Sequence, residues 1–194
     1  MDLSPTAYVV LGMLRHGPRS GYEIKQAVDR STRFFWAASY GQIYPELRKL
    51  AKAGLVEGEE RPQGGRRRTV YTLTDAGRER LRDWLAEDPE LLEIRDEALL
   101  KLFFADAASP GRAAEIVDAR RRTHEEKIER LRQIEPAAAK LADSDPYPYF
   151  VLRYGIAFSE WVVEWCEDAR RELEELEPRE RDESRRDRRK PDDG

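Results

Sequence analysis

Two groups of polar side chains in the first half of the sequence have the residue types that recognise a nucleic-acid duplex. The first group lies between residues 39 and 52 and combines one amide, three hydroxyls and three cations. A glutamine can pair with adenine and an arginine with guanine in the major groove, whereas hydroxyl and ammonium groups suit phosphate oxygens. The second group is a run of three arginines suited to phosphates or to a narrow minor groove. The candidate contacts are Ser39, Tyr40, Gln42, Tyr44, Pro45, Arg48, Lys49, Lys52, Arg66, Arg67 and Arg68.

Helix start signals predict the elements that would position these side chains. Ser4-Pro5 combines a capping hydroxyl with a proline at the first helical position, so it begins the first predicted helix. Ser20 and Glu23 have the three-residue spacing of a capping box and begin the second. Ser39 and Gln42 repeat that spacing and begin the third.

The third predicted helix has one apolar face and one polar face. Ile43, Leu47 and Leu50 recur at i, i+4 and i+7, which turns them inward and leaves the candidate contacts outward. Gly54 is the expected C-terminal cap of this helix.

The chain then changes to the alternating pattern of a β-hairpin. Residues 55–59 and 69–73 are the two predicted strands, and the arginine run lies between them among turn residues. Thr74-Asp75 begins a fourth helix, and Pro89 marks the expected domain boundary. Three helices, a hairpin and a further helix are the element order of a winged helix-turn-helix, which we assign to residues 1–88.

The second half is expected to be a helical dimerisation and effector domain over residues 89–176. Helices are predicted over residues 96–107, from Ser109-Pro110 onward with a kink or end at Pro136, and from Pro146 to the end of the domain. Aromatic residues along the last helix are too apolar to face water alone, so we assign them, together with residues 98–104, to a dimer interface. These interface residues are Phe150, Tyr154, Phe158, Trp161 and Trp165. Residues 177–194 are expected to form a disordered charged tail. The predicted fold class is therefore mainly α with a small β-hairpin.

Composition excludes several classes of protein. The 194 residues are 40% hydrophobic and 38% charged, with a net charge of −4 and one cysteine. That ratio suits helical packing, and one cysteine rules out an intrachain disulfide or a multi-thiolate metal site. No apolar run is long enough to span a membrane, and no secretion signal is present, so we expect a cytoplasmic protein. Charge is unevenly divided: residues 1–88 hold 15 Lys and Arg against 12 Asp and Glu, and the remainder hold 20 against 27.

Catalysis is not expected. His16, His124 and Cys166 are scattered over three predicted helices or turns and form neither a triad nor a metal-ligand set. No glycine-rich phosphate loop is present, because Gly64-Gly65 belongs to the hairpin turn. We therefore predict no enzyme activity, no cofactor and no metal.

The N-terminal motifs resemble those of the PadR family of transcriptional regulators over residues 3–86. The matching segments are Leu11-Gly12-Met13-Leu14-Arg15-His16-Gly17-Pro18, Gly21-Tyr22-Glu23-Ile24, Phe35-Trp36, Gly41, Ile43-Tyr44-Pro45, Leu47, Leu50, Gly54-Leu55-Val56, Gly65-Arg66, Arg68, Tyr71, Leu73-Thr74 and Gly77. The remainder resembles, by length and helix pattern, the larger subgroup whose C-terminal domain is like that of a virulence-gene activator. The chain departs from the family pattern at Gln42, where a small hydroxyl residue is more common.

The resemblance implies a homodimeric repressor that binds an inverted repeat in double-stranded DNA and responds to a small aromatic or drug-like ligand. Phe34, Phe35, Trp36 and Tyr147 are the candidate pocket residues, although such aromatic residues also fit a helical core. Two alternatives stay open at this point. One is a winged-helix module that docks proteins instead of DNA, and the other is a transcriptional activator without ligand sensing.

Overall fold

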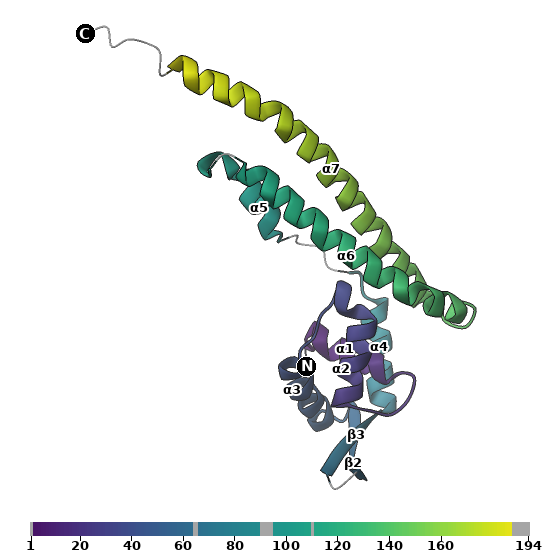
Figure 1. The fold of residues 1–194 in the computed structure, drawn as a ribbon. Coiled ribbons are helices and arrows are strands. Elements are labelled where there is room, and N and C mark those ends of the chain that lie inside the picture. Colours follow the sequence, from purple (N-terminus) through teal and green to yellow (C-terminus); the bar gives the residue numbers. More distant parts are fainter. Residues whose placement is uncertain (1, 64–65, 90–94, 110, 188–194) are drawn as a thin grey trace. The chain divides into compact units, whose positions relative to one another are not determined.

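A computed structural model describes residues 2–63, 66–89, 95–109 and 111–187 of the chain. The side chains of residues 63, 66, 67 and 177–187 lie outside this description. The chain divides into two compact units, residues 1–92 and residues 93–194. The division falls a few residues beyond the boundary expected at residue 88, and each unit has its own set of elements (Figure 1).

Unit 1 consists of helices with a small antiparallel sheet, which confirms the predicted fold class. Its elements are α1 (Pro5–Leu14), β1 (Arg19–Ser20), α2 (Gly21–Arg30), η1 (Thr32–Phe34), α3 (Tyr40–Lys52), β2 (Val56–Gln63), β3 (Arg66–Leu73) and α4 (Asp75–Ala86). The sheet has the order β1-β3-β2, with Arg19 opposite Tyr71 and Val56 opposite Leu73. The sequence did not reveal β1, because a two-residue strand has no alternating pattern to detect.

The predicted helix starts are present as side-chain caps. The Ser4 hydroxyl accepts a hydrogen bond from the Ala7 N–H at 3.2 Å and caps α1. At the start of α2, Glu23 accepts from the Ser20 N–H at 2.9 Å, and Ser20 accepts from the Glu23 N–H at 3.3 Å. Each cap satisfies a backbone donor that the first turn of a helix leaves without a partner.

The core of unit 1 holds α3 in place from its apolar side. Ile43, Leu47 and Leu50 are fully buried, as the i, i+4, i+7 spacing predicts. They belong to one cluster with residues of α1, α2, β2, β3 and α4; its larger members are Leu11, Leu14, Ile24, Val28, Val56, Leu73 and Leu81. The opposite face of α3 is thereby fixed as a solvent-facing surface.

Unit 1 also depends on a close approach between α4 and the turn that joins α3 to β2. Gly54 in that turn has φ +72°, a conformation that favours glycine. The Thr74 hydroxyl donates a hydrogen bond to the Gly54 carbonyl at 2.8 Å and accepts one from the Gly77 N–H at 3.0 Å. A Cβ atom on Gly77 would lie 2.1 Å from the carbonyl oxygen of Leu55, so only glycine fits there.

Unit 2 contains α5 (Glu97–Phe103), η2 (Ala105–Ala107), α6 (Arg112–Leu141) and α7 (Tyr147–Asp187). The helices of this unit differ from the expectations in three places. The second helix begins after Gly111 and not at Ser109, because Gly111 takes the N-cap position with φ +84°. It continues through Pro136 to Leu141, so that proline does not end it. The last helix extends to Asp187, so the backbone of residues 177–187 is helical where a disordered tail was expected; residues 188–194 lie outside the described residues.

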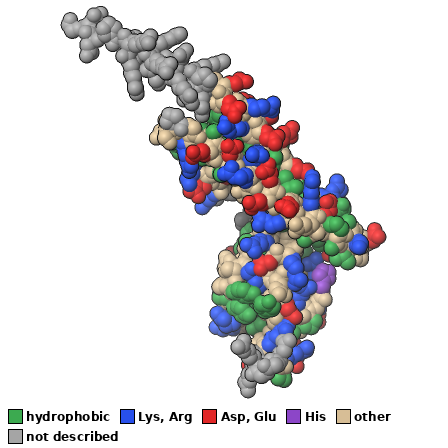
Figure 2. Space-filling model, viewed as in Figure 1, with side chains coloured by type: hydrophobic (Ala, Val, Ile, Leu, Met, Phe, Trp, Pro, Cys, Tyr) green, Lys and Arg blue, Asp and Glu red, His purple; other side chains and the backbone are tan. Residues whose placement is uncertain are grey.

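The helices of unit 2 pack around a small apolar cluster. Val117 of α6 and Val162 and Cys166 of α7 are its buried members. The carboxylate of Asp96 joins α5 to α6, because it caps α5 by accepting from the Leu99 N–H at 3.2 Å and also pairs with Arg120. Both long helices also carry many surface charges, and Figure 2 shows acidic and basic side chains interspersed along them.

Candidate nucleic-acid interface

The outward face of α3 carries most of the predicted contact residues. Ser39, Gln42, Arg48, Lys49 and Lys52 are exposed. Tyr40 and Tyr44 are also exposed, at 44% and 40%, and Pro45 is half-buried. The structure therefore brings the predicted residues 39–52 onto one side of a single helix, where a groove-binding helix needs its polar groups.

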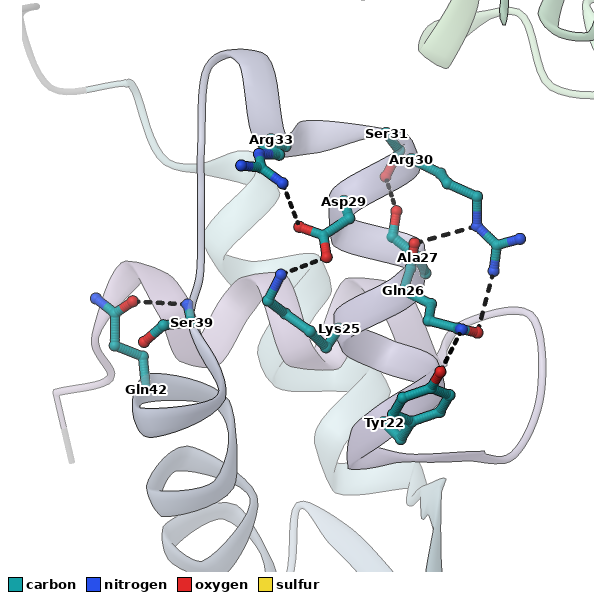
Figure 3. Close-up of polar contacts among 10 residues, drawn as sticks. All are labelled: Tyr22, Lys25, Gln26, Ala27, Asp29, Arg30, Ser31, Arg33, Ser39 and Gln42. Carbon is teal, nitrogen blue, oxygen red and sulfur yellow. Dashed lines mark hydrogen bonds and ion pairs between the residues drawn. The ribbon is translucent and has the colours of Figure 1, made fainter.

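The amide of Gln42 also has a local structural role. Its Oε1 atom accepts a hydrogen bond from the Ser39 N–H at 2.9 Å (Figure 3). This bond satisfies a backbone donor at the start of α3. The amide nitrogen lies on the side of the group away from Ser39 (Figure 3).

The three cations of α3 differ in how far the protein already neutralises them. Lys49 pairs with Glu46, with Nζ and Oε1 2.9 Å apart, and Glu46 is almost fully buried. Within the described part of the chain, Arg48 and Lys52 form no ion pair. They lie at i and i+4 on the same exposed side, so they are the cations of α3 most available to an anionic partner.

A row of three tyrosines joins α2 to α3 beside this face. The rings of Tyr22 and Tyr40 stack with centroids 6.4 Å apart, and those of Tyr40 and Tyr44 with centroids 6.2 Å apart. The Lys25 ammonium lies 5.6 Å from the centre of the Tyr40 ring. A Cβ atom on Gly21 would lie 2.7 Å from the Tyr44 ring, so glycine there allows Tyr44 to pack against α2. Tyr22 and Lys25 were not among the predicted contacts, because nothing in their spacing links α2 to the tyrosines of α3.

Polar side chains of α2 and of η1 are linked to one another by hydrogen bonds and ion pairs (Figure 3). Asp29 pairs with Lys25 and, at 3.5 Å, with Arg33. On another side of the helix, Gln26 donates a hydrogen bond to the Tyr22 hydroxyl at 2.9 Å, and Arg30 donates to the Gln26 carbonyl at 3.2 Å. These contacts stiffen the helix that supports α3.

The hairpin arginines fall into two groups. Arg68 pairs with Glu23, which completes the capping box of α2, and thereby ties strand β3 of the hairpin to that helix. The Arg68 guanidinium and the Ser20 N–H hold the pKa of Glu23 at about 2, below its usual 4.5. Arg66 and Arg67 lie nearer the hairpin turn, opposite Gln63 and Pro62, and their side chains lie outside the described residues.

The candidate ligand-pocket residues come from both units. Phe34 and Phe35 form an edge-to-face pair with centroids 4.8 Å apart, and Trp36 is 41% exposed. Tyr147 begins α7 in unit 2 and is exposed. A pocket shared by these four side chains stays a prediction.

Most of the predicted interface residues form an exposed aromatic stripe on α7. Phe150, Tyr154, Phe158 and Trp161 are between 39% and 63% exposed. Trp165 differs, because it packs against the cluster formed by Val117, Val162 and Cys166 within the unit. The large apolar residues of the segment 98–104 are also mostly exposed, and Phe103 reaches 79%. An apolar surface of this kind is typical of a protein interface.

The remaining reactive side chains have structural surroundings. Burial and the nearby charges of Arg120 and Lys127 lower the pKa of His124, whose ring meets Phe158 edge to face. Burial raises the pKa of the Cys166 thiol. Among the residues that the structure describes, no group of His, Cys, Asp and Glu could hold a metal ion. None of the helices described is both long and apolar enough to cross a membrane.

Comparison with known proteins gives matches over both units. Residues 10–83 match the Transcriptional regulator PadR-like family, and residues 94–174 match the family described as Virulence activator alpha C-term. The chain is 32% identical over 168 residues to the negative transcriptional regulator PadR of Bacillus subtilis, covering 82% of this chain and 92% of the relative.

Two solved structures of that Bacillus subtilis protein also resemble the whole chain. Its complex with operator DNA has a TM-score of 0.80 and 30% identity, covering 88% of this chain and 99% of the other. Its complex with p-coumaric acid has a TM-score of 0.71 and 28% identity, covering 89% and 99%. The similarity therefore extends over the winged-helix unit and the helical unit together.

Proposed function

The chain belongs to the PadR-like family of transcriptional regulators, and we propose that it is a homodimeric repressor that binds an inverted repeat in operator DNA and is released by a small aromatic ligand. The relatives are transcriptional regulators and not enzymes. The exposed polar face of α3 is the single observation that carries the DNA-binding part of this proposal. It joins an amide, hydroxyls and the cations Arg48 and Lys52, which form no ion pair with any residue described, on one helix that a buried apolar face holds in place.

Each part of the face has a proposed role in the complex. Gln42 and Arg48 contact base edges, whereas Ser39, Tyr40, Tyr44, Lys49 and Lys52 contact the sugar-phosphate backbone. Pro45 packs against sugars, and Arg66 and Arg67 approach the backbone from the hairpin. Arg68 contributes by holding the hairpin against α2 through Glu23.

The dimer in this proposal forms through the aromatic stripe of α7, that is Phe150, Tyr154, Phe158 and Trp161. A second copy of the chain would remove these side chains from water, and a two-fold axis would place two α3 helices about 34 Å apart, one turn of DNA. Trp165 supports the stripe from within the unit. The exposed residues of α5 add to the same interface.

The ligand in this proposal is a small aromatic molecule. The Bacillus subtilis relative has been solved with p-coumaric acid, and the sequence of the present chain offers Phe34, Phe35, Trp36 and Tyr147 as candidate aromatic contacts. An aromatic ring of this kind would stack on a planar ligand.

Binding to DNA from upstream of the protein's own gene tests the proposal. Purified protein is titrated into a labelled duplex from that region and into a scrambled duplex of the same composition, at two salt concentrations. Selective binding that weakens steeply with salt is expected, because each phosphate contact releases counterions. Weak and unselective binding at both salts would contradict the proposal and favour a protein-docking module.

The same duplex then tests dimerisation and ligand release. The mass of the complex should correspond to two chains per duplex. Addition of p-coumaric acid and related phenolic acids should release the DNA at concentrations that leave the fold intact.

A further inference from the structure

The hydrogen bond between Gln42 and Ser39 restricts what Gln42 can offer to a base. Only an oxygen can accept from the Ser39 N–H, so this 2.9 Å contact fixes which end of the amide is Oε1. The nitrogen then lies on the far side of the group, directed away from Ser39 (Figure 3). Gln42 therefore directs its N–H donors outward from the first turn of α3, while its Oε1 points back at the backbone of the helix.

This orientation conflicts with the pairing of glutamine and adenine. That pairing requires the amide oxygen to accept from adenine N6 while the nitrogen donates to N7. Turning the amide so that both of its ends face adenine would move Oε1 away from the Ser39 N–H and weaken the cap at the start of the helix, at a cost of up to about 1 kcal/mol. An amide that directs only its N–H groups outward instead fits a base edge that has only acceptors, and in the major groove guanine has two adjacent ones, O6 and N7.

The rest of α3 has the same donor character. The helix contains a single carboxylate, Glu46, which is almost fully buried and pairs with Lys49. The other charged groups on the exposed face are cations, and the remaining polar groups are tyrosine hydroxyls. No carboxylate of α3 is thus available to accept from cytosine N4 or adenine N6.

We propose that Gln42 is a specificity-determining residue that reads guanine through its amide N–H groups, with its Oε1 kept as the cap of α3. This inference rests on the proposed function, because it assumes that α3 enters the major groove. The variant Gln42→Glu separates the two roles of the side chain. A glutamate at this position still accepts from the Ser39 N–H, as in a capping box, and suits the positive end of a helix, but it has no donor to offer a base.

The experiment selects preferred sequences from a random duplex library with the wild-type protein and with Gln42→Glu. Gln133→Glu serves as a matched control, since it makes the same chemical change at an exposed position of unit 2. The wild type and Gln133→Glu are expected to select guanine at one position of each half-site. Gln42→Glu is expected to replace that guanine by cytosine, whose N4 donates to a carboxylate.

Base analogues then test the atoms involved. Replacing the selected guanine by 7-deazaguanine, which lacks N7, should weaken wild-type binding by about 5-fold or more. Inosine, which keeps both O6 and N7, should bind as guanine does. The affinity of Gln42→Glu should not change with 7-deazaguanine at that position.

The outcomes distinguish this inference from the proposed function. If the wild type selects a clear motif and Gln42→Glu selects the same one, Gln42 reads no base and only this inference fails. Selection of adenine or thymine at the position that Gln42→Glu alters would also overturn it, as would equal affinity for guanine and 7-deazaguanine. If the wild type selects no motif, the proposed function fails as well.

Discussion

The ion pair between Glu23 and Arg68 should make the stability of the winged-helix unit depend on pH. The pKa of Glu23 is lowered from 4.5 to about 2, chiefly by the Arg68 guanidinium and then by the Ser20 N–H. At about 1.4 kcal/mol for each unit of pKa, this shift sets an upper bound of about 3.5 kcal/mol on the contribution of the Glu23 carboxylate to the free energy of unfolding. The Glu23 side chain is 41% exposed, so solvent screening reduces the expected contribution to about 1 kcal/mol.

The sign of the effect follows from the direction of the shift. A carboxylate whose pKa is lower in the folded state stabilises the fold above its unfolded pKa, here 4.5. The stabilisation is lost as the pH falls from 4.5 towards 2, because the unfolded state takes up the proton first. The contribution should therefore be complete at neutral pH and less than half as large near pH 3.

The variant Glu23→Gln isolates the charge, since glutamine can still accept from the Ser20 N–H and keep the cap of α2. Urea unfolding followed by tryptophan fluorescence should show a loss of about 1 kcal/mol at pH 7 and a smaller loss at pH 3. Combining this variant with Arg68→Gln in a double-mutant cycle measures the coupling between the two side chains. Glu57→Gln, an exposed carboxylate on β2, is the matched control. An equal loss at both pH values, or no coupling in the cycle, would refute the reasoning.

Three further predictions concern the core, the interface with DNA and the dimer. Gly77→Ala should lower the free energy of unfolding, measured by urea titration, by about 2 kcal/mol or more, because the new Cβ would overlap a backbone carbonyl. Gly12→Ala is the control, since a Cβ there meets open space, and it should be neutral or stabilising in the same titration. Arg48→Ala should weaken binding to operator DNA and relax the base preference at one position of each half-site, with little change in the slope of log affinity against log salt. A decrease of that slope by about 0.9 per protomer with unaltered base preference would make Arg48 a phosphate contact instead. Trp161→Ala should give a folded monomer in analytical ultracentrifugation, since Trp161 is 57% exposed within the single chain. Trp165→Ala should instead destabilise unit 2 itself, because Trp165 packs against its apolar cluster. A stable dimer of the Trp161 variant would exclude Trp161 from the interface.

Local signals predicted most of unit 1. The capping box of Ser20 and Glu23 involves neighbouring residues, so its spacing alone indicates the start of α2. The inward face of α3 follows from periodicity in the same way. These features depend on short stretches of chain, which a sequence displays directly.

Features that depend on distant segments could not be predicted. Arg68 reaches Glu23 because β3 pairs with β1, the two residues that directly precede α2. This pairing is not visible in the sequence, where Arg68 resembles the other two arginines of the run. The tyrosine row likewise depends on how closely α2 approaches α3 at Gly21. Local signals were less reliable in unit 2: Pro136 was expected to kink or end a helix, which does not end there, and Gly111 rather than Ser109 takes the cap position.

The tryptophan of α4 offers a way to observe the winged-helix unit alone. The ring of Trp84 lies flat against that of Tyr8 in α1, with centroids 4.4 Å apart and planes inclined by 8°. The guanidinium of Arg80 lies 5.6 Å from the centre of the same tyrosine ring. Excitation energy absorbed by a tyrosine at such a separation passes efficiently to the indole. Tyrosine-sensitised emission from Trp84 should therefore decrease when α4 leaves α1. A variant in which Trp36, Trp161 and Trp165 are replaced would make Trp84 an optical reporter of the unfolding of this unit.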